Sequence, residues 1–429
     1  MEVVDLSSVF DHIAGAYLAI MRAPLEGVRV VAVDSFMAAP SAGAILADLG
    51  ADVVKIEPLS GDPIRGNFRP AKVDGGLRRY DLQFDVDNRG KRSIAIALDT
   101  DEGASLAQRL CGHAQVFMCN LLPHRQERFG LDPASLMALN PSIVHATLTG
   151  YGTNGPDARR PGYDVTAFFG RSGLYDAMRE GDEGMVPSAR PAQGDHTAGI
   201  ALVAAILAGL RVAEATGEGQ VVETSLFEAA VWTQASDFAT TAVDRAPVRR
   251  RRRTELFVAS ANRFPCGDGS WIVLNNIEVA AWPRMCGAMG LENLIEDNRF
   301  ATAKERFDNM EELVGLLDER FVTRTRDEWG ALFDEAGIVW GPVLGLHEVA
   351  VDEQAEAIGL FPTVEHPDLG PYRTVRAPMR FKGLDVRPRG PSPTIGEHTR
   401  EVLASAGLSA SEIDELAAAD IIGEPTIDE

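Results

Sequence analysis

Asp195 is the residue best placed for chemistry in this chain of 429 residues. It ends the segment Pro191–Asp195, which reads PAQGD, and an apolar run begins soon after it at Ile200. This pattern predicts a helix over 197–216 with the carboxylate in a glycine-flanked turn at its N-terminus, where the helix dipole favours the ionised form. An aspartate in such a turn either caps the helix or attacks an electrophilic carbonyl.

Other titratable side chains each admit two interpretations. Tyr163 and Asp164 follow a Pro-Gly pair, and they are either acid–base groups or ordinary hydrogen-bonded residues. Glu223 and Glu228 flank a strand-to-helix junction, where carboxylates make helix-end contacts. His196 adjoins Asp195 only in sequence, which does not place it in a catalytic triad, and we interpret it as local structure.

The segment Gly150–Gly155 reads GYGTNG, which matches the GxGxxG pattern of dinucleotide-binding loops. A dinucleotide site also needs an apolar helix directly after the glycines and an acidic ribose ligand further on. The residues that follow, 156–161, read PDARRP instead. We therefore interpret this segment as a structured loop.

The chain carries a formal net charge of −22, which disfavours nucleic acid and anionic membranes as partners. An anionic substrate would need a local basic pocket. Basic residues in loops at the ends of predicted strands are typical of nucleotide phosphate sites. They are Arg65, Arg89, Lys91, Arg92, Arg125 and Arg128. The run Arg249–Arg253 is interpreted as a solvated linker, with anion binding as the alternative.

The sequence carries no signal-peptide pattern at its start and no run of 18 apolar residues. Its eight histidines show no metal-binding spacing, and we expect no metal site. The four cysteines form no CxxC pair and are interpreted as free thiols, which is typical of the reducing cytoplasm. They are Cys111, Cys119, Cys266 and Cys286.

Short apolar runs alternate with helical patterns over residues 1–240, which predicts an α/β domain with a parallel sheet. A linker is expected over 241–257. A smaller α+β unit is predicted over 258–340, and the segment 341–429 combines a second linker with two final helices near 397–406 and 410–419.

Several segments, in this order along the chain, resemble the family III CoA-transferases, a family that includes formyl-CoA transferase, the carnitine CoA-transferases and the bile-acid-inducible F-like proteins. The resemblance spans about residues 27–405. The matching segments are 27–31, 39–40, 46–58, 61–65, 88–94, 120–131, 150–156, 194–199, 217–229, 341–343 and 396–399.

The resemblance implies a large Rossmann-like domain built from N- and C-terminal segments, with a smaller α+β domain between them, and an interlocked homodimer. It also implies that Asp195 corresponds to the family's catalytic aspartate. That carboxylate would carry CoA from an acyl-CoA thioester to a free carboxylic acid through a mixed anhydride and an aspartyl-CoA thioester.

The same resemblance implies a CoA site without a metal. Asn120, Leu121 and Arg128 would line it, Lys91 and Arg92 would lie near the CoA phosphates, and Arg65 belongs to the loop that meets the nucleotide. Cations are expected there because CoA carries phosphate groups.

Two features depart from the family. The glycine-rich loop of formyl-CoA transferase has no clear counterpart between 254 and 275, which argues against formyl or oxalate chemistry. Formyl-CoA transferase has a catalytic glutamine where this chain has Met37, which argues against formyl or oxalate chemistry and suits a larger or less polar acyl group. Two alternatives remain open. An α-methylacyl-CoA racemase would place a histidine where Tyr163 stands, and a tyrosine with an ordinary pKa of ~10 is a poor base. A non-catalytic CoA-binding protein would not depend on Asp195.

Overall fold

The computed structural model describes residues 22–66, 71–73, 76–78 and 80–425. They divide into two compact units. The first comprises the described parts of Met1–Leu174, Ser188–Ala239 and Gly359–Glu429, and the second comprises Tyr175–Pro187 and Thr240–Ile358. The sequence places the smaller unit within 258–340 and does not assign 175–187 to it. The sequence also predicts an amphipathic extension over 1–26, most of which lies outside the described residues.

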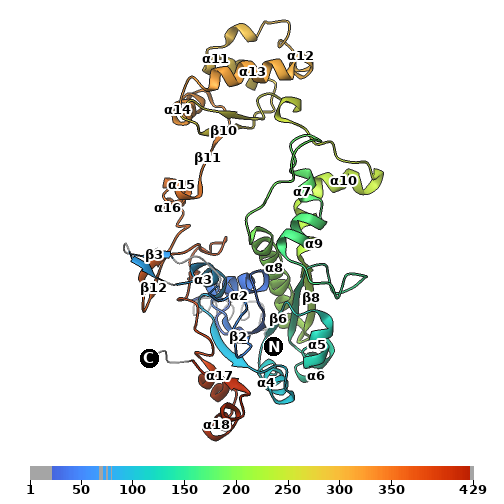
Figure 1. Cartoon of the computed structure of the whole chain (residues 1–429), viewed down its shortest axis with the longest axis vertical. Coiled ribbons are helices and arrows are strands. Elements are labelled where there is room, and N and C mark those ends of the chain that lie inside the picture. Colours follow the sequence, from blue (N-terminus) through green and yellow to red (C-terminus); the bar gives the residue numbers. More distant parts are fainter. Residues whose placement is uncertain (1–21, 67–70, 74–75, 79, 426–429) are drawn as a thin grey trace, which may run out of the picture. The chain divides into compact units, whose positions relative to one another are not determined.

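The first unit is organised around a seven-stranded sheet in the order β14-β5-β2-β1-β6-β7-β8 (Figure 1). Six strands are parallel, and only the edge strand β14 is antiparallel to its neighbour. The order reverses between β1 and β6, as in a Rossmann sheet. The strands are β1 (Arg29–Val33), β2 (Asp52–Glu57), β5 (Arg92–Ile96), β6 (Val116–Cys119), β7 (Val144–Thr149), β8 (Gln220–Ser225) and β14 (Ile422–Gly423).

Helices cover both faces of this sheet, which explains why its central strands are buried on both sides. On one face, Val31, Ile56 and Phe117 join a core with helix residues such as Leu110 and Leu403. That face carries α4 (Asp101–Cys111), α5 (Pro123–Phe129), α6 (Pro133–Leu139), α17 (Thr399–Ser405) and α18 (Ala410–Ala418). Figure 1 shows the red C-terminal helices beside the blue N-terminal strands. The α/β class predicted from the sequence is confirmed.

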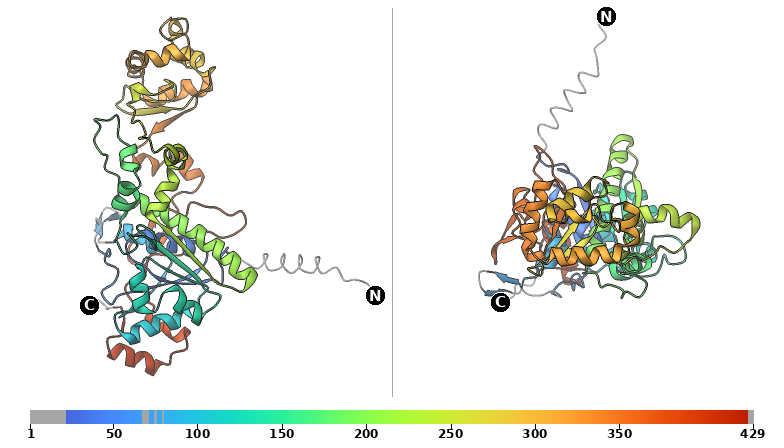
Figure 2. Two further views of the ribbon diagram at one scale, coloured as in Figure 1. Left: turned by 90° about the vertical axis from the view of Figure 1, so that its right-hand side faces the viewer. Right: turned by 90° about the horizontal axis from the view of Figure 1, so that it is seen from above.

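The other face carries α2 (Ala38–Asp48), α3 (Leu82–Asn88) and the long α8 (Gln193–Thr216) (Figure 2). A Cβ at Gly199 would lie 2.2 Å from Ser41 Oγ, so the glycine permits the close approach of α8 to α2. By length and composition α8 could also cross a membrane. Core helices satisfy the same test, and Leu202 and Ile206 of α8 are fully buried in this unit.

The remaining elements of the first unit are shorter. They are the hairpins β3–β4 (Ala71–Val73, Gly76–Arg78) and β12–β13 (Thr363–His366, Gly370–Arg373), the π-helix Asp164–Arg171, and α9 (Leu226–Thr233). Helices α7 (Leu174–Ala177) and α10 (Ala235–Asp244) each extend across a boundary between the units.

The second unit is a small α+β fold with its own core. Phe264 and Phe321 stack at 4.4 Å beside Trp329 and Phe333. Its sheet has the order β11-β10-β9, with β9 (Arg263–Pro265), β10 (Trp271–Leu274) and β11 (Trp340–Val343). Its helices are α11 (Ala281–Met289), α12 (Ala303–Asp308), α13 (Met310–Phe321), α14 (Arg326–Ala336), α15 (Leu346–Val349) and α16 (Glu353–Ala357).

The arginine run lies in this unit and is more than a solvated linker. Arg250 pairs with Asp176 at 2.5 Å, and Arg253 pairs with Asp318. These ion pairs connect the run to the segment 175–187 and to α13.

Candidate active site

The candidate site is a cavity of about 420 Å³ in the first unit. It lies at the carboxyl ends of β1, β6 and β7, where the residues that follow these strands meet the start of α8. Ser35–Ala38 follow β1 and Asn120–Leu122 follow β6, so the cavity occupies the point where the strand order reverses. That crevice is where open parallel α/β sheets bind their ligands.

Asp195 lies in the first turn of α8 and lines this cavity. The helix begins at Gln193, four residues earlier than the sequence predicts, and Ala192 is its N-cap residue. Asp195 is therefore not the cap. Its carboxylate is partly buried and faces the cavity, which leaves it free for chemistry.

Asp164 holds the turn that precedes α8. The Ala192 N–H donates to Asp164 Oδ2 at 2.8 Å, and the Val165 N–H donates to Oδ1 at 2.6 Å. Ala192 has a φ of +72°, a left-handed conformation that is unfavourable for a residue with a Cβ. Asp164 is buried, and its two hydrogen bonds fix both the π-helix start and the strained turn that presents Asp195.

The pKa of Asp195 is raised to about 7, first by burial and then by the negative charges of Asp164 and Asp87, while His196 opposes the shift. The sequence argument expects the opposite, because a helix N-terminus favours an ionised acid. Desolvation and two nearby carboxylates outweigh that preference here. The sequence could not place Asp87, which comes from α3, beside the start of α8.

His196 makes a contact beyond its own helix. Its Nε2 lies 3.0 Å from Asp87 Oδ1. Burial lowers the pKa of His196, but the hydrogen bond to Asp87 and the charges of Asp87 and Asp195 outweigh burial, so the pKa is raised overall. His196 thus links α8 to α3 and supplies a neighbouring positive charge when it is protonated.

A buried ion cluster lies beneath the cavity loop after β1, and sequence reasoning missed it. Lys55 Nζ donates to Asp34 at 2.6 Å and to Asp62 at 2.8 Å, and these side chains are fully buried. The charge of the two carboxylates raises the pKa of Lys55 against the effect of burial. Asp62 Oδ1 also accepts from the Phe36 N–H at 3.2 Å. A lysine inside the apolar strand 52–57 is the sequence signal that could have indicated such a cluster.

Phe36 and Tyr163 form one wall of the cavity. Their rings meet edge to face with centroids 5.3 Å apart. Phe36 has a φ of +64°, so the buried cluster holds it in a conformation that its own side chain disfavours. Met37 lies beside it in the lining.

Two of the residues that the sequence assigns to CoA line the cavity, namely Asn120 and Leu121. The Asn120 side chain bridges to the loop after β1, since its Nδ2 donates to Ser35 O at 2.7 Å and its Oδ1 accepts from the Ser35 N–H at 3.1 Å. Arg128 lies on α5, which follows the lining residues Asn120 and Leu121 in the sequence. Its side chain is 64% exposed and pairs with Asp99 at 3.4 Å. The residue of α5 that lines the cavity is Arg125.

The other three predicted CoA residues are engaged elsewhere. Arg65 pairs with Glu57 through two hydrogen bonds of 2.6 and 2.7 Å. Arg92 pairs with Asp52, the first residue of β2, which lies at the opposite end of that strand from the cavity.

Lys91 is fully buried, and its Nζ donates to Pro40 O at 2.9 Å and to Asn88 at 3.0 Å. Burial lowers its pKa to about 8. None of Arg65, Lys91 and Arg92 is among the described lining residues.

The other candidates from the sequence have structural contacts. The loop 150–155 begins where β7 ends, and Thr153 donates a hydrogen bond to Glu223. Ser225 caps α9 by accepting from the Glu228 N–H at 3.1 Å, and its Oγ donates to the Glu228 carboxylate at 2.7 Å. The four cysteines are buried and free. Within the described ranges, no group of three or more His, Cys, Asp and Glu residues has an arrangement that could hold a metal ion.

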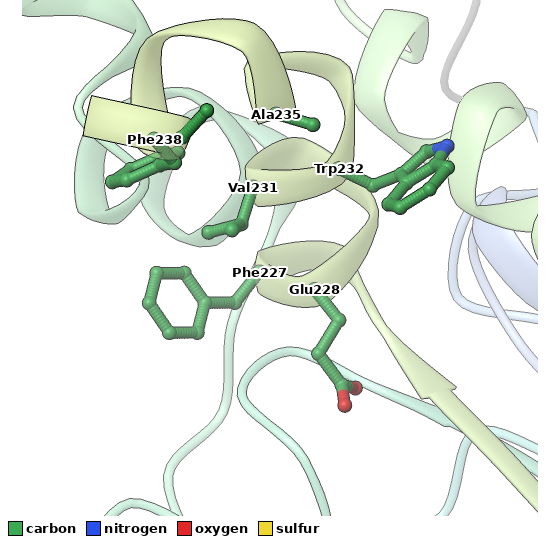
Figure 3. A pocket seen from close by; sticks show the side chains of 7 residues that line it. Phe227, Glu228, Val231, Trp232, Ala235 and Phe238 are labelled. Carbon is green, nitrogen blue, oxygen red and sulfur yellow. The ribbon is translucent and has the colours of Figure 1, made fainter. Parts of the chain in front are cut away.

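A second cavity, of about 460 Å³, lies on α9 and the first turn of α10, away from Asp195 (Figure 3). Figure 3 shows Phe227, Val231, Trp232 and Phe238 projecting around it, with the Glu228 carboxylate below. Trp232 is 80% exposed. Monomeric proteins seldom leave an aromatic side chain of this size in water beside other apolar groups.

The sequence of this chain is similar to those of known proteins. A family model described as CoA-transferase family III matches residues 25–399. The (R)-2-hydroxy-4-methylpentanoate CoA-transferase of Clostridioides difficile is 32% identical over 397 residues, which cover 91% of this chain and 97% of the relative. The succinate–glutarate CoA-transferase of Agrobacterium fabrum is 31% identical and covers 89% of this chain and 96% of the relative.

The fold of this chain is also similar to those of solved structures. A CaiB/BaiF family protein from Brucella suis matches with a TM-score of 0.79 and 30% identity, covering 90% of this chain and 100% of that one. The Mycobacterium tuberculosis protein Rv3272 matches with a TM-score of 0.76 and 28% identity, covering 89% of this chain and 99% of that one.

Proposed function

Since this chain belongs to CoA-transferase family III and is an enzyme of that kind, we propose that it transfers CoA from an acyl-CoA thioester to a free carboxylic acid through covalent intermediates on Asp195. The observation that carries the proposal is the position of Asp195. Its carboxylate lies in the first turn of α8 and faces the cavity at the point where the strand order reverses.

The proposed reaction begins when the ionised Asp195 carboxylate attacks the thioester carbonyl. The C–S bond breaks, CoA leaves as a thiolate, and a mixed anhydride remains. The thiolate attacks the aspartyl carbonyl of that anhydride, which releases the donor acid as a carboxylate and forms an aspartyl-CoA thioester. The acceptor carboxylate then repeats both steps in reverse order, and Asp195 is regenerated.

The surroundings of Asp195 support this role in two ways. A buried carboxyl group with a pKa of about 7 is partly ionised at neutral pH. Because it is poorly solvated, its ionised form is more nucleophilic than a carboxylate in bulk water. The N-terminal turn of α8 also presents backbone N–H groups near the positions where negative charge develops during each attack.

We place the CoA arm along Asn120 and Leu121, which line the cavity, with Arg125 and the exposed Arg128 of α5 available for its phosphates. The ion pair of Arg65 and the burial of Lys91 leave these two residues as proposed neighbours of the nucleotide rather than free cations. Arg92 pairs with Asp52 at the opposite end of β2, so it is not included in the proposed CoA site. Replacing Arg128 with alanine should weaken CoA binding more than acceptor binding.

We further propose that the enzyme is a homodimer. A second copy would cover the apolar surface around Trp232 on α9 and the exposed apolar side chains of α8, which include Ile200 and Val212. Burial of that surface would stabilise the dimer, because the removal of apolar area from water is the main driving force for association.

The covalent relay is tested by mixing the enzyme with a panel of acyl-CoAs in the presence of hydroxylamine and heavy water, followed by peptide mass spectrometry. A hydroxamate on Asp195 is the expected product. The Asp195→Asn variant should show no hydroxamate label, and its transfer rate should be at least about 1,000-fold lower than that of the wild type. It should keep its fold and oligomeric state. Deuterium at the substrate α-carbon without a label would indicate racemisation instead. Unchanged transfer in Asp195→Asn would contradict the mechanism.

A further inference from the structure

We propose that the acyl part of this cavity accepts monocarboxylic acids with an apolar, branched or aromatic side chain and discriminates against dicarboxylic acids. The inference rests on the proposed CoA transfer at Asp195. It concerns the group that lies beside that carboxylate in the acyl-CoA, and the charges and walls of the cavity carry it.

The first observation is charge. Among the described lining residues, the charged ones are Asp164, Asp195 and Arg125. The described lining therefore carries two carboxylates and one guanidinium. Asp164 cannot turn away, because both of its oxygens hold backbone N–H groups. A second substrate carboxylate placed near this pair would meet repulsion in a partly desolvated space.

The single cation is poorly placed to offset that repulsion. Arg125 belongs to α5, the helix that we assign to the CoA phosphates, and its guanidinium lies 5.6 Å from the ring centroid of Phe129. A dicarboxylic acid would have to compete with CoA for this group. Without it, the distal carboxylate would be buried unpaired, which is strongly unfavourable.

The second observation is the wall beside Asp195. Phe36, Met37, Tyr163 and Leu226 present aromatic and aliphatic groups from three separate segments of the chain. The Phe36 turn is fixed from beneath by Asp62, which in turn binds the buried Lys55. The apolar wall is therefore built into the fold rather than assembled around a substrate, and it suits a hydrocarbon side chain.

A matched pair of thioesters tests the inference on the intact enzyme. In 4-methylpentanoyl-CoA an isopropyl group replaces the distal carboxylate of succinyl-CoA, so size is nearly constant and only the charge changes. The measurement is the rate of hydroxylamine-trapped label on Asp195 with each thioester, which needs no knowledge of the natural donor and acceptor. We expect 4-methylpentanoyl-CoA to label at least about 100-fold faster.

A cation introduced into the wall should reverse the discrimination. Tyr163→Arg is expected to reduce the ratio of the two rates by at least about tenfold, because the guanidinium can pair with the distal carboxylate. Leu139→Arg on α6, at a position 55% exposed and outside the cavity lining, is the matched control and should leave the ratio unchanged.

The outcomes separate the two proposals. Equal labelling, or faster labelling by succinyl-CoA, overturns the inference and leaves the Asp195 relay standing. An unchanged ratio in Tyr163→Arg overturns the assignment of this wall to the acyl group. If no acyl-CoA in the wider panel labels Asp195 in the folded enzyme, the relay itself fails, and the inference fails with it.

Discussion

At the scale of single residues, the site depends on a balance of charges around Asp195. Burial and the carboxylates of Asp164 and Asp87 favour its protonated form, whereas His196 favours its ionised form. The balance brings the pKa of Asp195 to about 7. The nucleophile is therefore available near neutrality without being fully satisfied by solvent or by a cation.

The charge of Asp164 should be visible in the pH dependence of transfer. Because Asp195 must be ionised to attack, kcat/KM is expected to rise with pH through about 7. Asp164→Asn removes a negative charge that raises the pKa of Asp195, so the rise should move to lower pH by about one unit. Asp414→Asn on α18, an exposed position, is the control. A rise that stays in place, or moves to higher pH, would mean that Asp164 acts only through its hydrogen bonds.

Asp195 should also lower the stability of the fold at alkaline pH. A carboxyl whose pKa is raised by folding contributes stability that is fully present below its unfolded pKa and is lost as the pH rises through about 7. Asp195→Asn is neutral at every pH. Its free energy of unfolding at pH 8 should therefore exceed that of the wild type by about 1–2 kcal/mol, an amount that allows for the partial exposure of Asp195. Unfolding at pH 8 and pH 4 checks this, since the difference should be several-fold smaller at pH 4, close to the ordinary pKa of 3.8.

At the scale of elements, the N-terminus of α8 is set by the π-helix Asp164–Arg171. Gly194, one residue before Asp195, has no room for a side chain, because a Cβ there would lie 2.6 Å from Phe168 and 3.0 Å from Asp164. The position of the nucleophile thus depends on contact between two helices that are joined by more than twenty residues of intervening chain.

Gly194→Ala should therefore displace the start of α8. We expect transfer to fall at least about tenfold and stability to fall by about 1–3 kcal/mol, as for other overpacked sites. Gly315→Ala is the matched control, because Gly315 lies within helix α13 with nothing within 4 Å of its added Cβ. That variant should be as active as the wild type. If both variants behave alike, the contact with Phe168 does not position Asp195.

Elements with a strong local pattern could be predicted from the sequence. The acidic residues Asp101 and Glu102 open a pattern that predicts a helix over 101–111, and the apolar run 116–119 predicts a strand. The structure has both elements with these bounds, and Thr100 caps the helix. The sequence could not predict the start of α8, because the turn at Ala192 is held by Asp164 and not by a local cap. It also gave no indication of the two-residue edge strand β14, which exists only through pairing with β5.

The candidate site was predictable in part. The local pattern predicts Asp195 at the start of a helix, whereas Asn120 and Leu121 were assigned through the family resemblance. All three line one cavity at an edge of the parallel sheet. The basic residues were harder to place, because a cation at a strand end can as easily pair with a carboxylate from another strand. Arg65 with Glu57 and Arg92 with Asp52 are such pairs.

At the scale of the whole molecule, the proposed dimer should depend on the apolar surface of α9. Trp232→Glu places a charge at an exposed position of that surface and should shift the protein from dimer to monomer in sedimentation velocity. Leu139→Glu on α6, also exposed, should leave the dimer intact. Two variants that sediment alike as dimers would exclude this surface as the interface.

The order of the sheet has a consequence for biosynthesis. Strand β5 forms early in the chain, yet its outer edge is paired by Ile422 and Gly423, and α17 completes the core against the same strand. The ribosome must therefore make the entire second unit before the first can close. Until residue 422 emerges, the nascent protein exposes an unpaired strand edge and an uncovered apolar face, both of which invite aggregation. The last strand of the chain therefore closes the edge of a sheet whose other strands are all made earlier.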